Sequence, residues 1–136
     1  MDYRKYLEAF NKSDRFSVEN GIRLTALSAG HAEAELIATQ AHTNFMGTVH
    51  GGLLYTLCDV VGGCALIERG LCVTLDAATT YLRPVKCGKV RAVAERVKGG
   101  GHIGVSRVEV FDEVGELCIT AQITMYMTGE PLPELK

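Results

Sequence analysis

The sequence has no long apolar run, and its N-terminal stretch, MDYRKYLEAFNKSDRF, is mostly polar or charged. A membrane helix needs about 18 or more apolar residues in succession, and a signal peptide needs an apolar core near the N-terminus. Neither pattern is present. We therefore expect a cytoplasmic protein that does not enter a membrane.

The sequence also has no excess of charge of one sign. It carries 14 basic and 16 acidic residues, scattered along the chain, for a formal net charge of -2. Nucleic acids and anionic membranes are bound by basic stripes or patches. We therefore expect neither nucleic acid nor a membrane among the partners.

The cysteines show no pairing pattern. Their number is odd and no C-x-x-C spacing occurs, which argues against both a disulfide framework and a zinc site. We expect them to be reduced and mostly buried. They are Cys58, Cys64, Cys72, Cys87 and Cys118.

A length of 136 residues with 47% hydrophobic residues is enough for one domain with its own core, over 1–136. Helical spacing of apolar residues predicts a short N-terminal helix over 2–10, and two strands over 18–27 and 32–38 follow it. From 51 to about 69 runs one long helix with apolar residues all round its circumference. Such a helix must be enclosed by other structure.

Four further strands are predicted at 72–82, 89–97, 103–111 and 117–127, separated by turn residues. The last of them alternates cleanly between apolar and polar positions, as in a sheet covered on one face. An antiparallel sheet curled around one central helix buries the apolar faces of both. The sequence therefore predicts an α+β fold of this kind.

The segment Asn44-Phe45-Met46-Gly47-Thr48-Val49-His50-Gly51-Gly52 is followed by Asp59 on the helix, by Thr74-Leu75-Asp76, and by Tyr81-Leu82-Arg83-Pro84-Val85. This combination resembles the PaaI-like branch of the hotdog thioesterases, over about 43–128. The resemblance implies a hotdog fold, a homodimer that often pairs into a homotetramer, and acyl-coenzyme A (acyl-CoA) substrates. It implies no cofactor, because coenzyme A enters as part of the substrate.

Carried over by position, the resemblance makes Asp59 the catalytic carboxylate and Gly51 the donor of a backbone N–H to the thioester oxygen. Asn44 and His50 become supporting polar groups, and Thr74 helps to place the attacking water. A glycine N–H at a helix N-terminus also suits this role physically, because the helix dipole favours an oxyanion there and the missing Cβ lets a carbonyl approach.

The spacing of Gly51 and Asp59 gives a second inference. They are separated by eight positions, which a rise of about 1.5 Å per residue turns into roughly 12 Å along one helix. Groups that act on one carbonyl must come within about 3.5 Å of it. If both are catalytic, they act from different subunits of a two-fold dimer with antiparallel central helices.

The chemistry leaves alternatives open. Asp59 either activates a water or attacks the carbonyl itself to form an anhydride. Another hotdog enzyme, such as a hydratase or dehydratase, and a non-catalytic acyl-CoA-binding protein are the competing functions. A metal site made of His42, His50 and Asp59 matches no familiar spacing, and Cys58, beside apolar residues on a helix, is expected to be inert.

Several residues are predicted to bind substrate. Three glycines at 99–101, followed by His102, stand where many family members carry a basic residue near the coenzyme, so that phosphate contact is in doubt. Other basic residues near the mouth of the site are candidates instead. The predicted substrate-binding residues are Gly52, Met46, Tyr55, Gly62, Gly63 and Leu66 for the acyl group, and Arg83 and Lys98 for the coenzyme.

Overall fold

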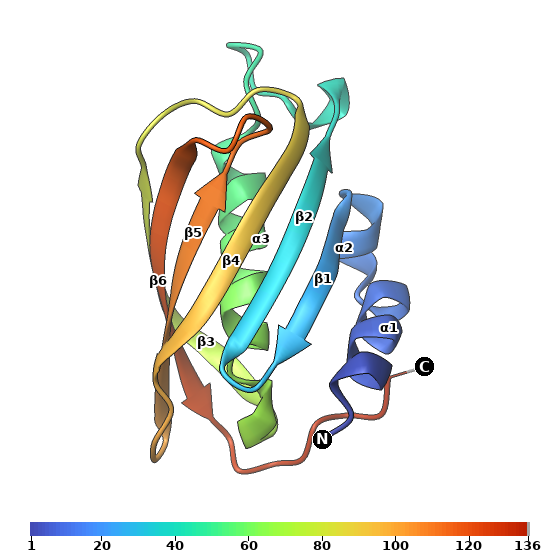
Figure 1. Cartoon of the computed structure of the whole chain (residues 1–136), viewed down its shortest axis with the longest axis vertical. Helices are drawn as coiled ribbons and strands as arrows, with labels where there is room; N and C mark the ends of the chain where they lie inside the picture. Colours follow the sequence, from blue (N-terminus) through green and yellow to red (C-terminus); the bar gives the residue numbers. More distant parts are fainter. Residues whose placement is uncertain (136) are drawn as a thin grey trace.

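The computed structural model describes residues 1–135. One six-stranded antiparallel sheet has the spatial order β1-β2-β4-β5-β6-β3, and the long helix α3 lies against one of its faces (Figure 1). The predicted sheet around one helix is confirmed. The elements are α1 (Tyr3–Ser13), α2 (Arg15–Glu19), β1 (Ile22–Ser28), β2 (His31–Ala38), η1 (Gln40–His42), α3 (Gly51–Cys64), η2 (Ile67–Arg69), β3 (Cys72–Tyr81), β4 (Gly88–Lys98), β5 (Ile103–Phe111) and β6 (Leu117–Met127).

The sheet covers most of α3, but not all of it. Leu57, Cys58 and Val61 are fully buried in the core between helix and sheet. On the opposite side Gly52 and Tyr55 are exposed, and Asp59 is half-buried. The prediction that the whole circumference of the helix is enclosed is therefore wrong for this open strip.

The close approach of α3 to the sheet depends on glycine. A Cβ on Gly62 would lie 2.5 Å from Cγ1 of Ile123 and 3.0 Å from the hydroxyl of Ser106. That buried hydroxyl donates to the Gly62 carbonyl at 2.9 Å. Carbon atoms in contact normally stay about 3.5–4.0 Å apart, so no side chain fits at this position.

The two edges of the sheet differ. The β1 edge is blocked by Asn11 of α1, whose side chain donates to the Leu24 carbonyl at 2.9 Å and accepts from the Leu24 N–H at 2.8 Å. The β3 edge has no neighbour within residues 1–135, and it carries the exposed apolar side chains of Val73 and Leu75. Leu75 is an extra residue in this strand, because Thr74 pairs with Met125 and Asp76 with the adjacent Thr124.

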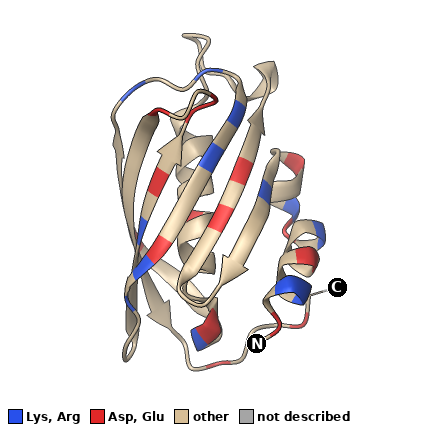
Figure 2. Ribbon diagram, viewed as in Figure 1, with Lys and Arg blue, Asp and Glu red and all other residues tan. Residues whose placement is uncertain are grey.

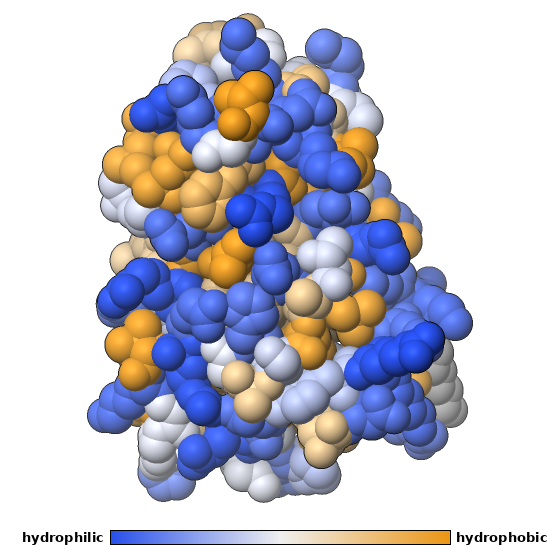
Figure 3. Space-filling view, viewed as in Figure 1, coloured by the Kyte–Doolittle hydropathy of each residue, from blue (hydrophilic) through white to orange (hydrophobic). Residues whose placement is uncertain are grey.

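The outer face of the sheet is charged. Lys, Arg, Asp and Glu alternate along β2 and β4 (Figure 2), and the face is mostly hydrophilic (Figure 3). His31 lies between two carboxylates there, with Nδ1 2.5 Å from Glu95 and Nε2 3.1 Å from Glu33. Burial disfavours the imidazolium form, but the hydrogen bonds to Glu33 and Glu95 outweigh it, so the pKa of His31 is raised above 6.5.

Three predicted boundaries need correction. The chain over 15–19 is the helix α2 and not the start of a strand, so β1 begins only at Ile22. The N-terminal helix extends to Ser13. The long helix ends at Cys64, and the 3-10 turn η2 continues to Arg69, because the chain must turn back there to enter β3. No helix of the described part is long and apolar enough to cross a membrane.

Candidate active site

The open strip of α3 places Asp59 beside β3. The hydroxyl of Thr74 donates to Oδ1 of Asp59 at 2.6 Å and also lies 3.3 Å from the sulfur of Met125. Both residues were predicted as site residues, and the structure brings them together. A half-buried carboxylate held by one hydroxyl keeps its remaining lone pairs available to water or substrate.

The first turn of α3 presents an unused amide. His50 caps the helix, because its Nδ1 accepts the Gly52 N–H at 2.9 Å. The neighbouring N–H of Gly51 has no acceptor within residues 1–135. An unpaired amide at a helix start, next to the positive end of the helix dipole, is a ready site for a carbonyl oxygen that gains negative charge.

Tyr81 fixes this helix start and was not predicted as a site residue. Its hydroxyl donates to the Gly51 carbonyl at 2.7 Å. Burial, and then the neighbouring Cys58 and Tyr55, raise the pKa of Tyr81 above its usual 10, so the hydroxyl keeps its proton. Nothing in the sequence pattern marks this contact, since it joins the end of β3 to a helix that starts thirty positions earlier.

A cavity of about 340 Å³ opens beside Gly51, and we call it the Gly51 cavity. Asn44 organises its loop: the side-chain oxygen accepts the N–H groups of Met46 at 3.0 Å and Thr48 at 3.3 Å. Asn44 and Met46 also line the cavity, as does Arg83. The structure thus supports a positioning role for Asn44 and places Met46 where a substrate can pass.

The predicted catalytic residues do not meet within one chain. Asp59 does not line the Gly51 cavity. It lies eight residues along the same helix from Gly51, which corresponds to about 12 Å. The described chain therefore contains two halves of a site, the carboxylate with Thr74 and the helix start with its loop.

Three predicted acyl-binding residues lie elsewhere. Gly62 contacts Ile123, Gly63 faces the end of the Met125 side chain, and Leu66 is fully buried. All three pack against the sheet, so the prediction that they line a substrate pocket is wrong. The glycines serve helix–sheet packing, and only Gly52 and Tyr55 of the predicted helix residues face the open strip.

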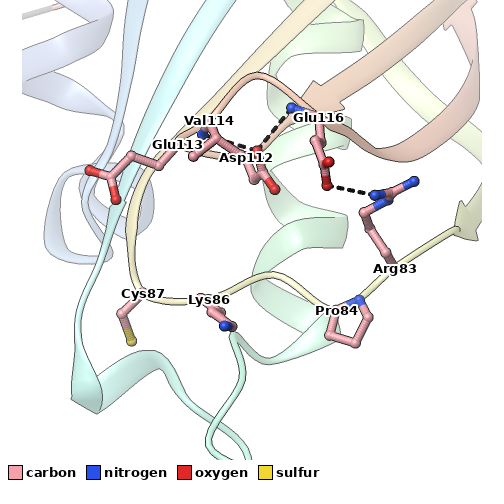
Figure 4. A pocket seen from close by; sticks show the side chains of 8 residues that line it. All are labelled: Arg83, Pro84, Lys86, Cys87, Asp112, Glu113, Val114 and Glu116. Carbon is pink, nitrogen blue, oxygen red and sulfur yellow. Dashed lines mark hydrogen bonds and ion pairs between the residues drawn. The ribbon is translucent and has the colours of Figure 1, made fainter.

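The largest cavity, about 430 Å³, lies away from both halves of the site. Figure 4 shows it between the loop that carries Arg83 and Lys86 and the turn that carries Asp112, Glu113 and Glu116. Arg83 pairs with Glu116 at 2.6 Å. With three carboxylates against two cations, this cavity is poorly suited to an anionic coenzyme.

Arg83 and Lys98, the two predicted coenzyme contacts, are far apart in the chain's fold. Lys98 ends β4, and the strand begins at Gly88 near the loop that holds Arg83. Ten residue steps at about 3.3 Å each span roughly 33 Å. Within one chain, these two side chains do not form a common site.

Cys58 behaves as a core residue. It is fully buried, and burial together with the nearby charge of Asp59 raises the pKa of its thiol to about 12. All five cysteines are free. In residues 1–135 no three His, Cys, Asp or Glu side chains are grouped so that they could hold a metal ion.

Relatives with names share most of this chain's length. The model of the thioesterase superfamily matches residues 46–119. Acyl-coenzyme A thioesterase 13 of Homo sapiens is 31% identical over 91% of this chain and 93% of its own. The proofreading thioesterase EntH of Klebsiella pneumoniae is 33% identical over 80% of this chain and 82% of its own.

Solved structures agree. The PaaI protein of the Escherichia coli phenylacetic acid degradation operon superposes with a TM-score of 0.89 over 96% of each chain at 22% identity, which shows the shared fold. A Streptococcus mutans protein solved with acetyl CoA gives a TM-score of 0.76 at 28% identity, over 81% of this chain and 90% of its own. With the family match over more than half of its length, the chain belongs to the thioesterase superfamily, in its hotdog, PaaI-like branch.

Proposed function

We propose that the protein hydrolyses an acyl- or aryl-CoA thioester to the free acid and coenzyme A. In this proposal Asp59 acts as general base or nucleophile, and the Gly51 N–H polarises the thioester carbonyl. One observation carries the assignment. A single helix presents both a carboxylate held by the Thr74 hydroxyl and, at its start, an amide without an acceptor in the described chain.

The names of the relatives support the substrate. A thioesterase acting on acyl-coenzyme A and a structure with bound acetyl CoA both lie within the matched family. During attack the carbonyl oxygen becomes an oxyanion, which the Gly51 N–H stabilises. The carbon–sulfur bond then breaks and the thiol of coenzyme A leaves. If Asp59 is the nucleophile, water next hydrolyses the acyl-aspartyl anhydride.

The open edge of the sheet supports a dimer. An edge strand with exposed backbone and apolar side chains invites another strand, and β3 carries Val73 and Leu75 there while Asn11 blocks the opposite edge. Pairing of two β3 strands about a two-fold axis brings the open strips of the two α3 helices together, antiparallel. Asp59 of one subunit then faces the start of α3 in the other.

The same arrangement unites the proposed coenzyme contacts. Arg83 and Lys98 are at opposite ends of the sheet in one chain, so an antiparallel partner brings unlike ends together. We further propose that two such dimers pair into a tetramer, and that the protein works in the cytoplasm, where its five free cysteines stay reduced.

The first experiment offers the purified protein a panel of acyl-CoA esters and follows the loss of thioester absorbance. We expect turnover of at least one ester, and a kcat for Asp59→Asn that is at least about 100-fold lower, as for the loss of a general base. Thioester absorbance is preferable to a thiol reagent because the protein's own cysteines react with such reagents. Undiminished turnover by Asp59→Asn refutes the role of this residue.

Gly51→Pro tests the amide. Proline is favoured at the first helical position and removes only the N–H, and the preceding His50 has a ψ of 131°, which proline tolerates. We expect kcat to fall by about 100- to 1000-fold. Gly51→Ala is the matched control, since it keeps the N–H and its Cβ meets Tyr81 only at 3.5 Å.

Mixing the two inactive variants tests whether the halves come from different subunits. Random reassociation makes half of the dimers mixed, and each mixed dimer has one intact site out of two. We therefore expect about one quarter of the wild-type activity to return when Asp59→Asn and Gly51→Pro chains are unfolded and refolded together. A mixture that stays inactive, while wild-type protein survives the same treatment, contradicts the shared site.

A further inference from the structure

A second groove lies on the other side of the α3 start from the Gly51 cavity. Its volume is about 240 Å³, and we call it the α2 groove because α2 forms one wall. Gly52 lines the α2 groove, whereas Gly51 lines the Gly51 cavity. The residues that the following argument uses are Phe16 and Asn20 from α2 and its end, His42 from η1, and Leu53 and Thr56 from α3.

The proposed thioester site therefore lies between two spaces of different charge. Arg83 lines the Gly51 cavity. No Lys, Arg, Asp or Glu of the described chain lines the α2 groove. The coenzyme carries phosphates and belongs on the cationic side of the thioester carbonyl. The uncharged side is left for the other half of the substrate, the acyl group.

We infer that the α2 groove binds the acyl group of the substrate and that Phe16 and Thr56 determine acyl preference. The inference rests on the proposed function, because it takes the Gly51 N–H as the binding point of the carbonyl. Phe16 is 62% exposed although it is a large apolar ring. An acyl group in the groove removes part of that ring from water, which favours binding.

The polar groups of the groove define the acyl class further. Nδ1 of His42 accepts the Thr39 N–H at 3.0 Å, so in the neutral imidazole Nε2 carries the proton and is a donor. Asn20 uses its amide nitrogen on the Phe16 carbonyl, at 2.9 Å, which leaves its side-chain oxygen as an acceptor. A hydroxyl on the acyl group satisfies such groups, whereas a long unbranched alkyl chain covers them without a partner. The occupant is therefore a compact acyl group that bears a hydroxyl.

The test compares kcat/KM for acetyl-, hexanoyl-, 3-hydroxyhexanoyl- and decanoyl-CoA. For the wild type we expect 3-hydroxyhexanoyl-CoA to exceed both hexanoyl- and decanoyl-CoA. Phe16→Ala removes the apolar wall and Thr56→Leu narrows the groove. Each is expected to lower the ratio of 3-hydroxyhexanoyl- to acetyl-CoA turnover about tenfold, the size of a lost contact in a specificity pocket.

Val18→Ala is the matched control. Val18 lies on the same helix and is 47% exposed, but it does not line the groove, so its loss is expected to leave the ratio unchanged. Turnover of the esters with a ratio that neither groove variant changes overturns the assignment of the α2 groove alone. A wild-type preference for decanoyl-CoA overturns the acyl class. No turnover of any ester refutes the proposed function itself, and the inference with it.

Discussion

Gly62→Ala tests whether the glycines of α3 serve the packing of the helix on the sheet. The new Cβ would meet Cγ1 of Ile123 at 2.5 Å and Cβ of Ile123 at 2.9 Å. A side-chain rotation relieves the first contact but not the second, because a Cβ is fixed to its backbone. The cost therefore lies near the upper end of the range for overpacking, about 3 kcal/mol. Alanine regains about 1 kcal/mol of helix propensity, which leaves a net loss of about 2 kcal/mol.

The assay is urea unfolding followed by circular dichroism, with the free energy of unfolding extrapolated to water. A loss of about 2 kcal/mol corresponds to a Tm that is lower by about 8 °C for a chain of this size. Gly63→Ala is the control, because its Cβ meets only the mobile Cε of Met125, at 3.2 Å, and we expect its stability to stay within about 0.5 kcal/mol of the wild type. Wild-type stability of Gly62→Ala combined with altered acyl preference would return Gly62 to a substrate pocket and refute this reasoning.

Three further predictions concern single hydrogen bonds. Thr74→Val removes the donor to Asp59, and we expect kcat to fall about tenfold with little change in KM, whereas Thr74→Ser keeps most of the activity; equal kcat values for the two variants contradict this role. Tyr81→Phe frees the Gly51 carbonyl, so we expect about 1 kcal/mol less stability in urea and a lower kcat, and an unaltered kcat means that the helix start needs no such anchor. The raised pKa of His31 stabilises the fold below the unfolded pKa of about 6.5 and ceases to do so as pH rises through the folded pKa. The stability difference between wild type and His31→Gln should therefore shrink from pH 6 to pH 9, and a difference that grows with pH overturns the assignment.

The sequence predicted most of the sheet correctly because its strands alternate or end at strong turn residues. The bounds of β5 and β6 agree with the prediction to the residue. The error at 15–19 arose where a short apolar run allows either helix or strand, and no period can decide between them. The predicted stop at Arg69–Gly70 is the end of η2 and not of α3, because composition does not distinguish the last helical turn from a 3-10 turn.

Within the candidate site, contacts near a motif were predictable and long-range ones were not. The resemblance placed Thr74 near Asp59, and the structure confirms that they lie together, while their catalytic roles stay predictions. The glycines of α3 were interpreted from helix geometry alone, which shows which residues share a face but not which partner covers that face. The hydrogen bond from Tyr81 to Gly51 depends on how β3 crosses the helix, which no local pattern encodes.

The extra residue in β3 sets a parity in this strand. Thr74 and Tyr81 are an odd number of positions apart, so in a regular strand their side chains would point to opposite faces of the sheet. Because Leu75 is bulged, both point toward α3, one to the carboxylate and the other to the helix start. Deleting Leu75 would leave every functional group of the site in the sequence, yet it would turn one of these two side chains to the outer face. The phase of a single strand, and not only the identity of its residues, thus belongs to the active site.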